Sequence, residues 1–189
     1  MRSKGFDGMV CSIAGVLAAI GDRWGLLILR DLCFGISRYD DFRMSSGVTN
    51  ATLSDRLKHL EANGLIERHL YQSNPPRYEY LLSEKGRGIA PVLAMLAELG
   101  DCWGVSGATE PPLMFVNRKS GAPVRWMPID QDTDEQLSTT DVLIKEGPGA
   151  DDLIRWRLSC ANNSKEVDEK LAARSGAVSK PAKRQFNFR

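Results

Sequence analysis

The chain has 189 residues, of which 42% are hydrophobic, with 25 Lys and Arg against 24 Asp and Glu. This length allows one domain, alone or with a smaller second one, and the apolar content is enough for a packed core. Residues 1–109 carry twelve charges of each sign, which excludes a domain-wide basic excess, so any basic surface must come from the placement of individual residues.

The N-terminal residues lack the apolar segment of a signal peptide, and no apolar run approaches membrane-spanning length, so we expect a cytoplasmic protein. The cysteines are scattered, which argues against a disulfide framework or a metal knuckle and predicts reduced thiols. They are Cys11, Cys33, Cys102 and Cys160.

Two helices are predicted first, over residues 12–20 and 24–34, with Gly21-Asp22 between them and Phe34-Gly35 closing the second. Apolar residues recur at helical spacing in the second helix and predict a core face. They are Trp24, Leu27, Ile28 and Leu32. Stacking of Trp24 on a ligand is the less favoured alternative.

A helix-turn-helix is predicted next. Residues 38–44 form its short first helix and residues 45–48 its turn. Thr49 is the expected N-cap of the second helix, which runs to Asn63 and buries Leu53, Leu57 and Leu60.

A β-hairpin and a further helix follow. Residues 67–71 and 77–82 are strand-like runs around 72–76, where two adjacent prolines fit a loop and predict a long tip. Ser83 is the expected N-cap of a helix to Trp103, which Pro91 kinks or divides. The apolar stripe beyond Pro91 predicts packing on a partner subunit, on a second domain, or on both.

The second helix of the helix-turn-helix has the width that fits the major groove of DNA, and the hairpin beside it can follow a phosphate backbone. Periodicity alone indicates only an amphipathic helix followed by a hairpin. The residue pattern across Cys11–Trp103 is more specific. It comprises Cys11-Ser12-Ile13-Ala14, residues 21–32 (GDRWGLLILRDL), Phe34-Gly35, Arg38-Tyr39, Phe42, residues 53–57 (LSDRL), residues 60–68 (LEANGLIER), residues 75–80 (PPRYEY) and residues 82–86 (LSEKG).

This pattern resembles the HxlR-type family of bacterial winged helix-turn-helix transcription regulators, which are MarR-like. The resemblance implies a mainly α fold, a winged helix-turn-helix with a small β hairpin and dimerisation helices. It also implies a repressor that binds palindromic operator DNA as a homodimer, with a small molecule as a possible effector. We predict contacts to bases and phosphates from Arg38, Thr49, Asn50, Thr52, Ser54, Asp55, Arg56, Arg68, Asn74 and Arg77.

In many relatives a Cys near position 11 senses oxidants, and a helix start favours the reactive thiolate, so Cys11 is the candidate regulatory residue. A buried structural thiol is the alternative. No nucleophile elbow, phosphate loop, metal-binding His pair or Cys-His dyad is present in the sequence, so neither an enzyme nor a cofactor is expected. The alternative function is a ligand-sensing or protein-interaction module that has lost DNA reading.

We predict four parts: a DNA-binding and dimerisation domain over 1–104, a linker over 105–112, a small β-rich C-terminal extension over 113–160, and a disordered basic tail over 161–189. Similar extensions in longer family members can bind zinc. The matching positions here are Asn117, Ser120, Asp130 and Thr133. None offers a thiol or imidazole, so we expect that the metal has been lost and that the extension hosts a small ligand or a partner.

Overall fold

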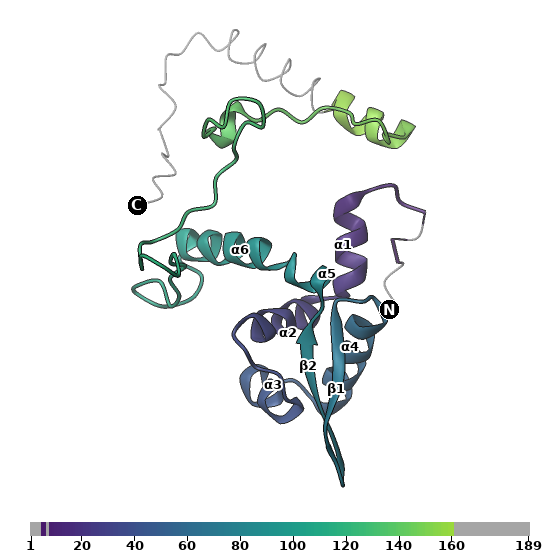
Figure 1. Cartoon of the computed structure of the whole chain (residues 1–189). Helices are drawn as coiled ribbons and strands as arrows, with labels where there is room; N and C mark the ends of the chain where they lie inside the picture. Colours follow the sequence, from purple (N-terminus) through teal and green to yellow (C-terminus); the bar gives the residue numbers. More distant parts are fainter. Residues whose placement is uncertain (1–4, 7, 161–189) are drawn as a thin grey trace. The chain divides into compact units, whose positions relative to one another are not determined.

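The computed structural model describes residues 5, 6 and 8–160, and the predicted basic tail lies outside them. The chain divides into two compact units, Met1–Trp126 and Met127–Arg189. In the first unit the elements run in the order α1 (Ser12–Ile20), α2 (Arg23–Cys33), α3 (Tyr39–Ser46), α4 (Asn50–Ala62), β1 (Ile66–Ser73), β2 (Pro76–Leu82), α5 (Glu84–Arg87) and α6 (Ala90–Trp103). This arrangement is a mainly helical winged helix-turn-helix, as predicted (Figure 1).

The core of the first unit joins α2, α3 and α4 to the base of the hairpin. Its largest fully buried apolar side chains are Phe42, Ile28, Leu29, Leu53, Leu57, Leu60 and Ile66. In α2, Leu29 is fully buried whereas the predicted core residue Leu27 is only half-buried. Trp24 packs against the core, which fits the predicted packing role.

The turn between α1 and α2 is fixed by the carboxylate of Asp22 and by a close contact between the backbones of Gly25 and Ile20. Asp22 Oδ1 accepts hydrogen bonds from the backbone N–H groups of Trp24 (2.9 Å) and Gly25 (3.1 Å), so Asp22 is the N-cap of α2. A Cβ at Gly25 would lie 2.1 Å from the Ile20 carbonyl oxygen, so only glycine fits where the two helices meet.

The helix-turn-helix consists of α3, a short turn and α4. Gly47 ends α3 in the left-handed conformation (φ 65°), and the Thr49 side chain caps α4 by accepting from Thr52 N. The predicted N-cap and the buried leucine stripe of α4 are therefore confirmed. The first helix runs two residues past the predicted Met44, so the turn is shorter than expected.

Strands β1 and β2 pair antiparallel from Ile66 opposite Leu82 to Ser73 opposite Pro76. The predicted long tip is wrong, because Ser73 and Pro76 belong to the strands. Pro76 begins its strand, where a missing N–H disturbs the ladder least. Tyr80 N also donates to Ser37 O (2.8 Å), and a bridge joins Arg38 to Glu79, so the chain before α3 lies along β2.

The predicted helix over 83–103 is divided. Ser83 caps α5, as expected, and α6 begins at Ala90 with Pro91 in its first turn, where a proline needs no intrahelical N–H partner. In the described residues, no single helix is long and apolar enough to cross a membrane. Helices α1 and α2 meet that criterion only as a pair, bent by 78° at their break.

The β-rich extension predicted over 113–160 is wrong. Its strand-like runs form no strand in the described residues, where only the isolated bridges Val116–Pro123 and Ile129–Gln136, the 3-10 helix η1 (Thr139–Asp141) and a helix over 152–160 occur. These runs, at 113–116, 124–127 and 142–144, are only three or four residues long. Prolines adjoin the first two, and proline lacks the N–H that a β ladder needs. The side chains of these runs stay largely exposed, at 79% for Met114 and 78% for Ile144.

Candidate nucleic-acid interface

Helix α4 presents an exposed face opposite its buried leucines. The exposed residues are Asn50, Ala51, Asp55, Lys58 and Ala62. Two predicted contact residues, Asn50 and Asp55, belong to this face, and the Asp55 side chain is 70% exposed. Thr52 and Ser54 are only half-buried to either side of it, so the outward surface begins at the N-terminus of the helix, where base contacts are made in helix-turn-helix proteins.

One flank of α4 is anchored to α3 by a tyrosine. The Tyr39 hydroxyl donates to Asn50 O (2.8 Å) and shares a 2.8 Å hydrogen bond with Ser54 Oγ. The Thr49 hydroxyl accepts from Thr52 N (3.3 Å) and lies 3.0 Å from Thr52 Oγ1. The predicted contact residues Thr49, Thr52 and Ser54 therefore also help to fix the start of the helix.

The other flank of α4 is anchored to the turn between α1 and α2. Arg56 Nε lies 3.0 Å from Asp22 Oδ2, and Arg56 Nη1 lies 3.0 Å from Asp55 Oδ2. His59 Nε2 also lies 2.9 Å from the carbonyl oxygen of Ala18 in α1. Arg56, a predicted DNA contact, thus has two carboxylate partners within its own chain.

Arg68 lies on the hairpin beside α4. Its guanidinium carbon is 4.4 Å from the centroid of the Tyr78 ring, and Arg68 Nε lies 3.8 Å from Glu61 Oε1 on α4. Burial raises the pKa of the neighbouring Tyr80 hydroxyl above its usual value, and the positive charge of Arg68 partly opposes that rise. Asn74 is at the exposed tip, where its carbonyl accepts from Gln72 Nε2 (3.1 Å).

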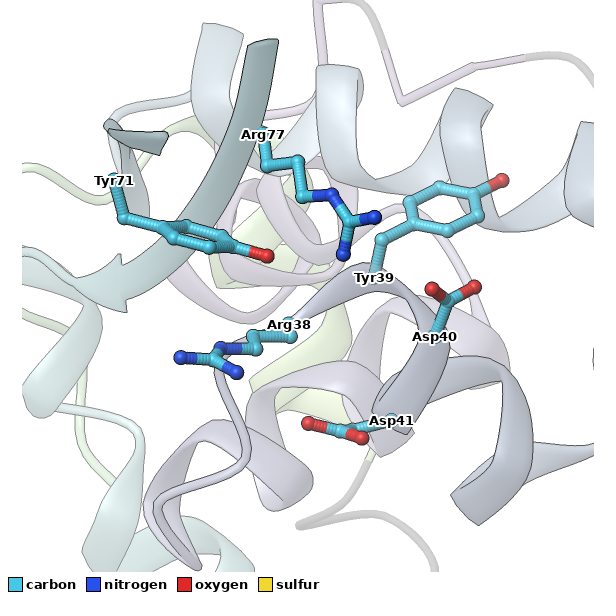
Figure 2. A pocket seen from close by; sticks show the side chains of 6 residues that line it. All are labelled: Arg38, Tyr39, Asp40, Asp41, Tyr71 and Arg77. Carbon is cyan, nitrogen blue, oxygen red and sulfur yellow. The ribbon is translucent and has the colours of Figure 1, made fainter. Parts of the chain in front are cut away.

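Arg38 and Arg77 are 39 residues apart in the sequence but line one surface pocket of about 430 Å³ between the start of α3 and the hairpin (Figure 2). Tyr39, Asp40, Asp41 and Tyr71 complete its lining. The guanidinium carbon of Arg38 lies 4.7 Å from the centroid of the Tyr71 ring.

Four residues that organise this surface were not among the predicted contacts. They are Asp22, Tyr39, His59 and Tyr71. Tyr39 and Tyr71 could have been found from the sequence, because aromatic residues interleaved with arginines are typical of nucleic-acid-binding surfaces. The links of α4 to Asp22 and Ala18 join positions 34 and 41 residues apart, and sequence spacing offers no signal for them.

Cys11, the predicted regulatory residue, is the half-buried N-cap of α1, and its side chain makes no capping hydrogen bond. Helix α1 leaves apolar side chains exposed, among them Ile13 at 71% and Leu17 at 50%. Helix α6 does the same at Met95 (56%) and Trp103 (64%).

The four positions predicted to correspond to zinc ligands belong to two turns of the same design. Asn117 Oδ1 accepts from Lys119 N (2.8 Å) and Ser120 N (3.2 Å), and Asp130 Oδ1 accepts from Asp132 N (2.9 Å) and Thr133 N (3.1 Å). Amide, carboxylate and hydroxyl oxygens already engaged in this way do not fit the thiolate and imidazole donors of a structural zinc site.

Known proteins with similar sequences share this architecture. The family model described as HxlR-like helix-turn-helix matches residues 19–107. The HTH-type transcriptional regulator Rv3095 of Mycobacterium tuberculosis strain H37Rv is 33% identical over 147 residues, which cover 78% of this chain and 91% of Rv3095. This protein belongs to the HxlR-like helix-turn-helix family.

Further relatives agree with that assignment. An HTH-type regulator of Methanothermobacter thermautotrophicus is 38% identical over 101 residues, covering 53% of this chain and 77% of the relative. Two solved structures of candidate transcription factors also match. PA1607 is 29% identical with a TM-score of 0.60, over 76% of this chain and all of that one. PA1374 from Pseudomonas aeruginosa is 33% identical with a TM-score of 0.53, over 78% of this chain and 99% of that one.

The family assignment determines the class of function. The chain is an HTH-type, DNA-binding transcriptional regulator of the HxlR family and not an enzyme.

Proposed function

We propose that this HxlR-family regulator is a repressor that binds a palindromic operator as a homodimer. The carrying observation is that α4 presents Asn50 and Asp55 outward while Tyr39 and Asp22 anchor its two flanks. A helix held rigidly in this way can read base edges in the major groove, where an amide pairs with adenine and a carboxylate accepts from cytosine N4. Arg68 and Arg77 of the hairpin then contact flanking phosphates.

Fluorescence anisotropy tests DNA reading. The protein is titrated against the DNA upstream of its own gene and against a scrambled duplex, each at two salt concentrations. We expect tight binding to the upstream DNA alone. Equal, weak binding to both duplexes would contradict sequence-specific regulation, because it would leave only attraction to phosphates.

Two variants separate base contacts from phosphate contacts. Asn50→Ala should change the preference among operator variants, because its exposed amide would contact a base. Arg77→Ala should weaken binding to all duplexes alike and reduce the slope of log affinity against log salt by about 1. Uniform loss across sequences for both variants would count against base reading by Asn50.

The homodimer is supported by the exposed apolar faces of α1 and α6, since contiguous apolar faces of this kind usually mark association surfaces. Sedimentation equilibrium should show a dimer. Leu17→Glu and Met95→Glu should shift it toward monomer and weaken operator binding, with far-UV circular dichroism unchanged. Met114→Glu, at a residue 79% exposed outside these helices, is the matched control and should stay dimeric. A monomeric wild-type protein that still binds the palindrome tightly would refute the dimer.

We further propose that oxidation of Cys11 modulates operator binding. Cys11 is the half-buried N-cap of α1, and it adjoins the apolar face assigned to the dimer. Desolvation raises the pKa of the Cys33 thiol, which makes Cys33 less reactive. Peroxide should weaken operator binding by the wild type and by Cys33→Ser but not by Cys11→Ser. A Cys11→Ser protein that responds like the wild type would remove the proposal.

A further inference from the structure

The pocket between α3 and the hairpin gathers two arginines on one open concave surface. Figure 2 shows Arg77 reaching in from the hairpin and Arg38 lying beside the Tyr71 ring. Both arginines are exposed, so a chain-like ligand lying along the surface can reach them without any opening of the fold.

Arg38 is held at both ends. Its backbone bridges to Glu79 of β2, next to the 2.8 Å hydrogen bond from Tyr80 N to Ser37 O. Its guanidinium lies over the Tyr71 ring at 4.7 Å, a cation–π contact that leaves the N–H donors at the guanidinium edge available. Arg77 is held in β2 opposite Gln72. Little side-chain entropy therefore remains to be lost when Arg38 binds an anion.

Neither arginine of the pocket is neutralised by an acidic partner in the described part of the chain, a property that they share with Arg43 of α3. Arg30, Arg56, Arg68 and Arg155 each pair with a carboxylate, whereas no ion pair formed by the described residues includes Arg38 or Arg77. Asp40 and Asp41 do line the pocket, but they occupy the first turn of α3, where the helix dipole stabilises their negative charge.

We propose that this pocket binds a single backbone phosphate of the operator, held jointly by Arg38 and Arg77. The inference rests on the proposed function and specifies where that function places one phosphate. Guanidinium groups match the geometry of phosphate oxygens and bind them through two parallel N–H donors. When both arginines bind the same phosphate, the hairpin and the start of α3 are held at one point of the DNA backbone. This fixes the orientation in which α4 enters the adjacent major groove.

The test replaces single phosphates of the operator by neutral methylphosphonates, placed symmetrically in both half-sites, and measures the affinity of each duplex. On the unmodified operator, Arg38→Ala and Arg77→Ala should each lose roughly tenfold in affinity. At one position the methylphosphonate should weaken wild-type binding by a similar factor and abolish the difference between the wild type and both variants.

Two further variants sharpen the result. Arg43→Ala removes an exposed arginine of α3 outside the pocket, and its effect should not depend on the methylphosphonate at that position. Asp41→Asn removes a negative charge from the pocket and should tighten binding to the unmodified operator severalfold. It should not tighten binding to the duplex that carries the neutral methylphosphonate at that position.

The outcomes separate this inference from the function on which it rests. If the wild type does not prefer its operator, the proposed function fails. If it does, but Arg38 and Arg77 couple to different phosphates or to none, the shared phosphate site is wrong while the regulator stands. Circular dichroism melts that match the wild type ensure that each loss of affinity belongs to the removed side chain.

Discussion

The winged helix-turn-helix and the segment over 113–160 contain apolar runs of similar composition but differ in how far they bury the apolar side chains. In the former, Ile28, Leu29 and Leu57 are almost completely buried, whereas in the latter Leu143 is 63% exposed. The runs of α2 and α4 repeat at helical spacing and meet each other across a shared core. The runs of the C-terminal segment are too short to bury a face or to find ladder partners. An apolar run thus becomes a stable element only where another element covers it.

The largest effect should come from opening the shared core. Leu57→Ala removes a side chain that is 2% exposed and should cost about 4 kcal/mol in the free energy of unfolding. Leu143→Ala is the matched deletion in the exposed segment and should change it by less than about 0.5 kcal/mol. Urea denaturation measures both. Similar losses for the two variants would show that the C-terminal segment also rests on a packed core.

A slightly smaller loss in the free energy of unfolding should follow when one carbon is added at a glycine that closely contacts another backbone segment. A Cβ at Gly86 of α5 would lie 1.9 Å from the Leu65 carbonyl oxygen, so Gly86→Ala must push α5 away and should cost about 3 kcal/mol. Gly147→Ala places its Cβ in open space and should be close to neutral. Thermal melts that do not distinguish the two variants would contradict the packing of α5 on the chain before β1.

A still smaller effect should separate the two roles of Asp22. Asp22→Ala removes the N-cap of α2 and the partner of Arg56 and should cost about 1.5 kcal/mol. Asp22→Asn retains a capping oxygen and should cost about 0.5 kcal/mol, because the ion pair is partly solvated. If both variants lose the same stability by urea denaturation, the capping role assigned to Asp22 is wrong.

The smallest effect is local and depends on pH. Two backbone N–H groups, of Asp132 and Thr133, lower the pKa of Asp130 below its usual value. These hydrogen bonds are therefore fully present above the pKa of an unfolded Asp, about 3.9, and are lost as pH falls through the lower value of the folded turn. The Thr133 amide shift in NMR should report this transition.

The turn at Asn117 is the internal control for that titration. It has the same hydrogen bonds without an ionisable side chain, so the Ser120 amide should not titrate. Asp130→Asn should likewise make the Thr133 signal independent of acid. A Thr133 midpoint at or above the usual Asp range would contradict the stabilised carboxylate.

Local chemistry explains which elements could be predicted. A Thr followed by a leucine stripe makes a capped amphipathic helix wherever a core is available, which is why α4 was predicted correctly. The start of α5 was predicted correctly from the capping side chain of Ser83 alone. The division at Pro91 also follows from one residue. The strand-like runs beyond residue 112 were predicted wrongly because β-propensity reflects a fit to neighbouring strands, which those runs lack.

The sequence by itself determined the caps at Thr49 and Ser83, the leucine stripe of α4 and the existence of the hairpin, because their signals are residues within a few positions of one another. The family pattern across Cys11–Trp103 is likewise a property of the residues alone. Only the tertiary structure decided that Arg38 and Arg77 share a pocket, that Tyr39 and Asp22 anchor the two flanks of α4, and that Arg56 has carboxylate partners within its own chain. Apart from the adjacent pair Arg56–Asp55, those relations join residues 11 to 39 positions apart, and their distances arise from the packing of α2, α3 and α4 around one core.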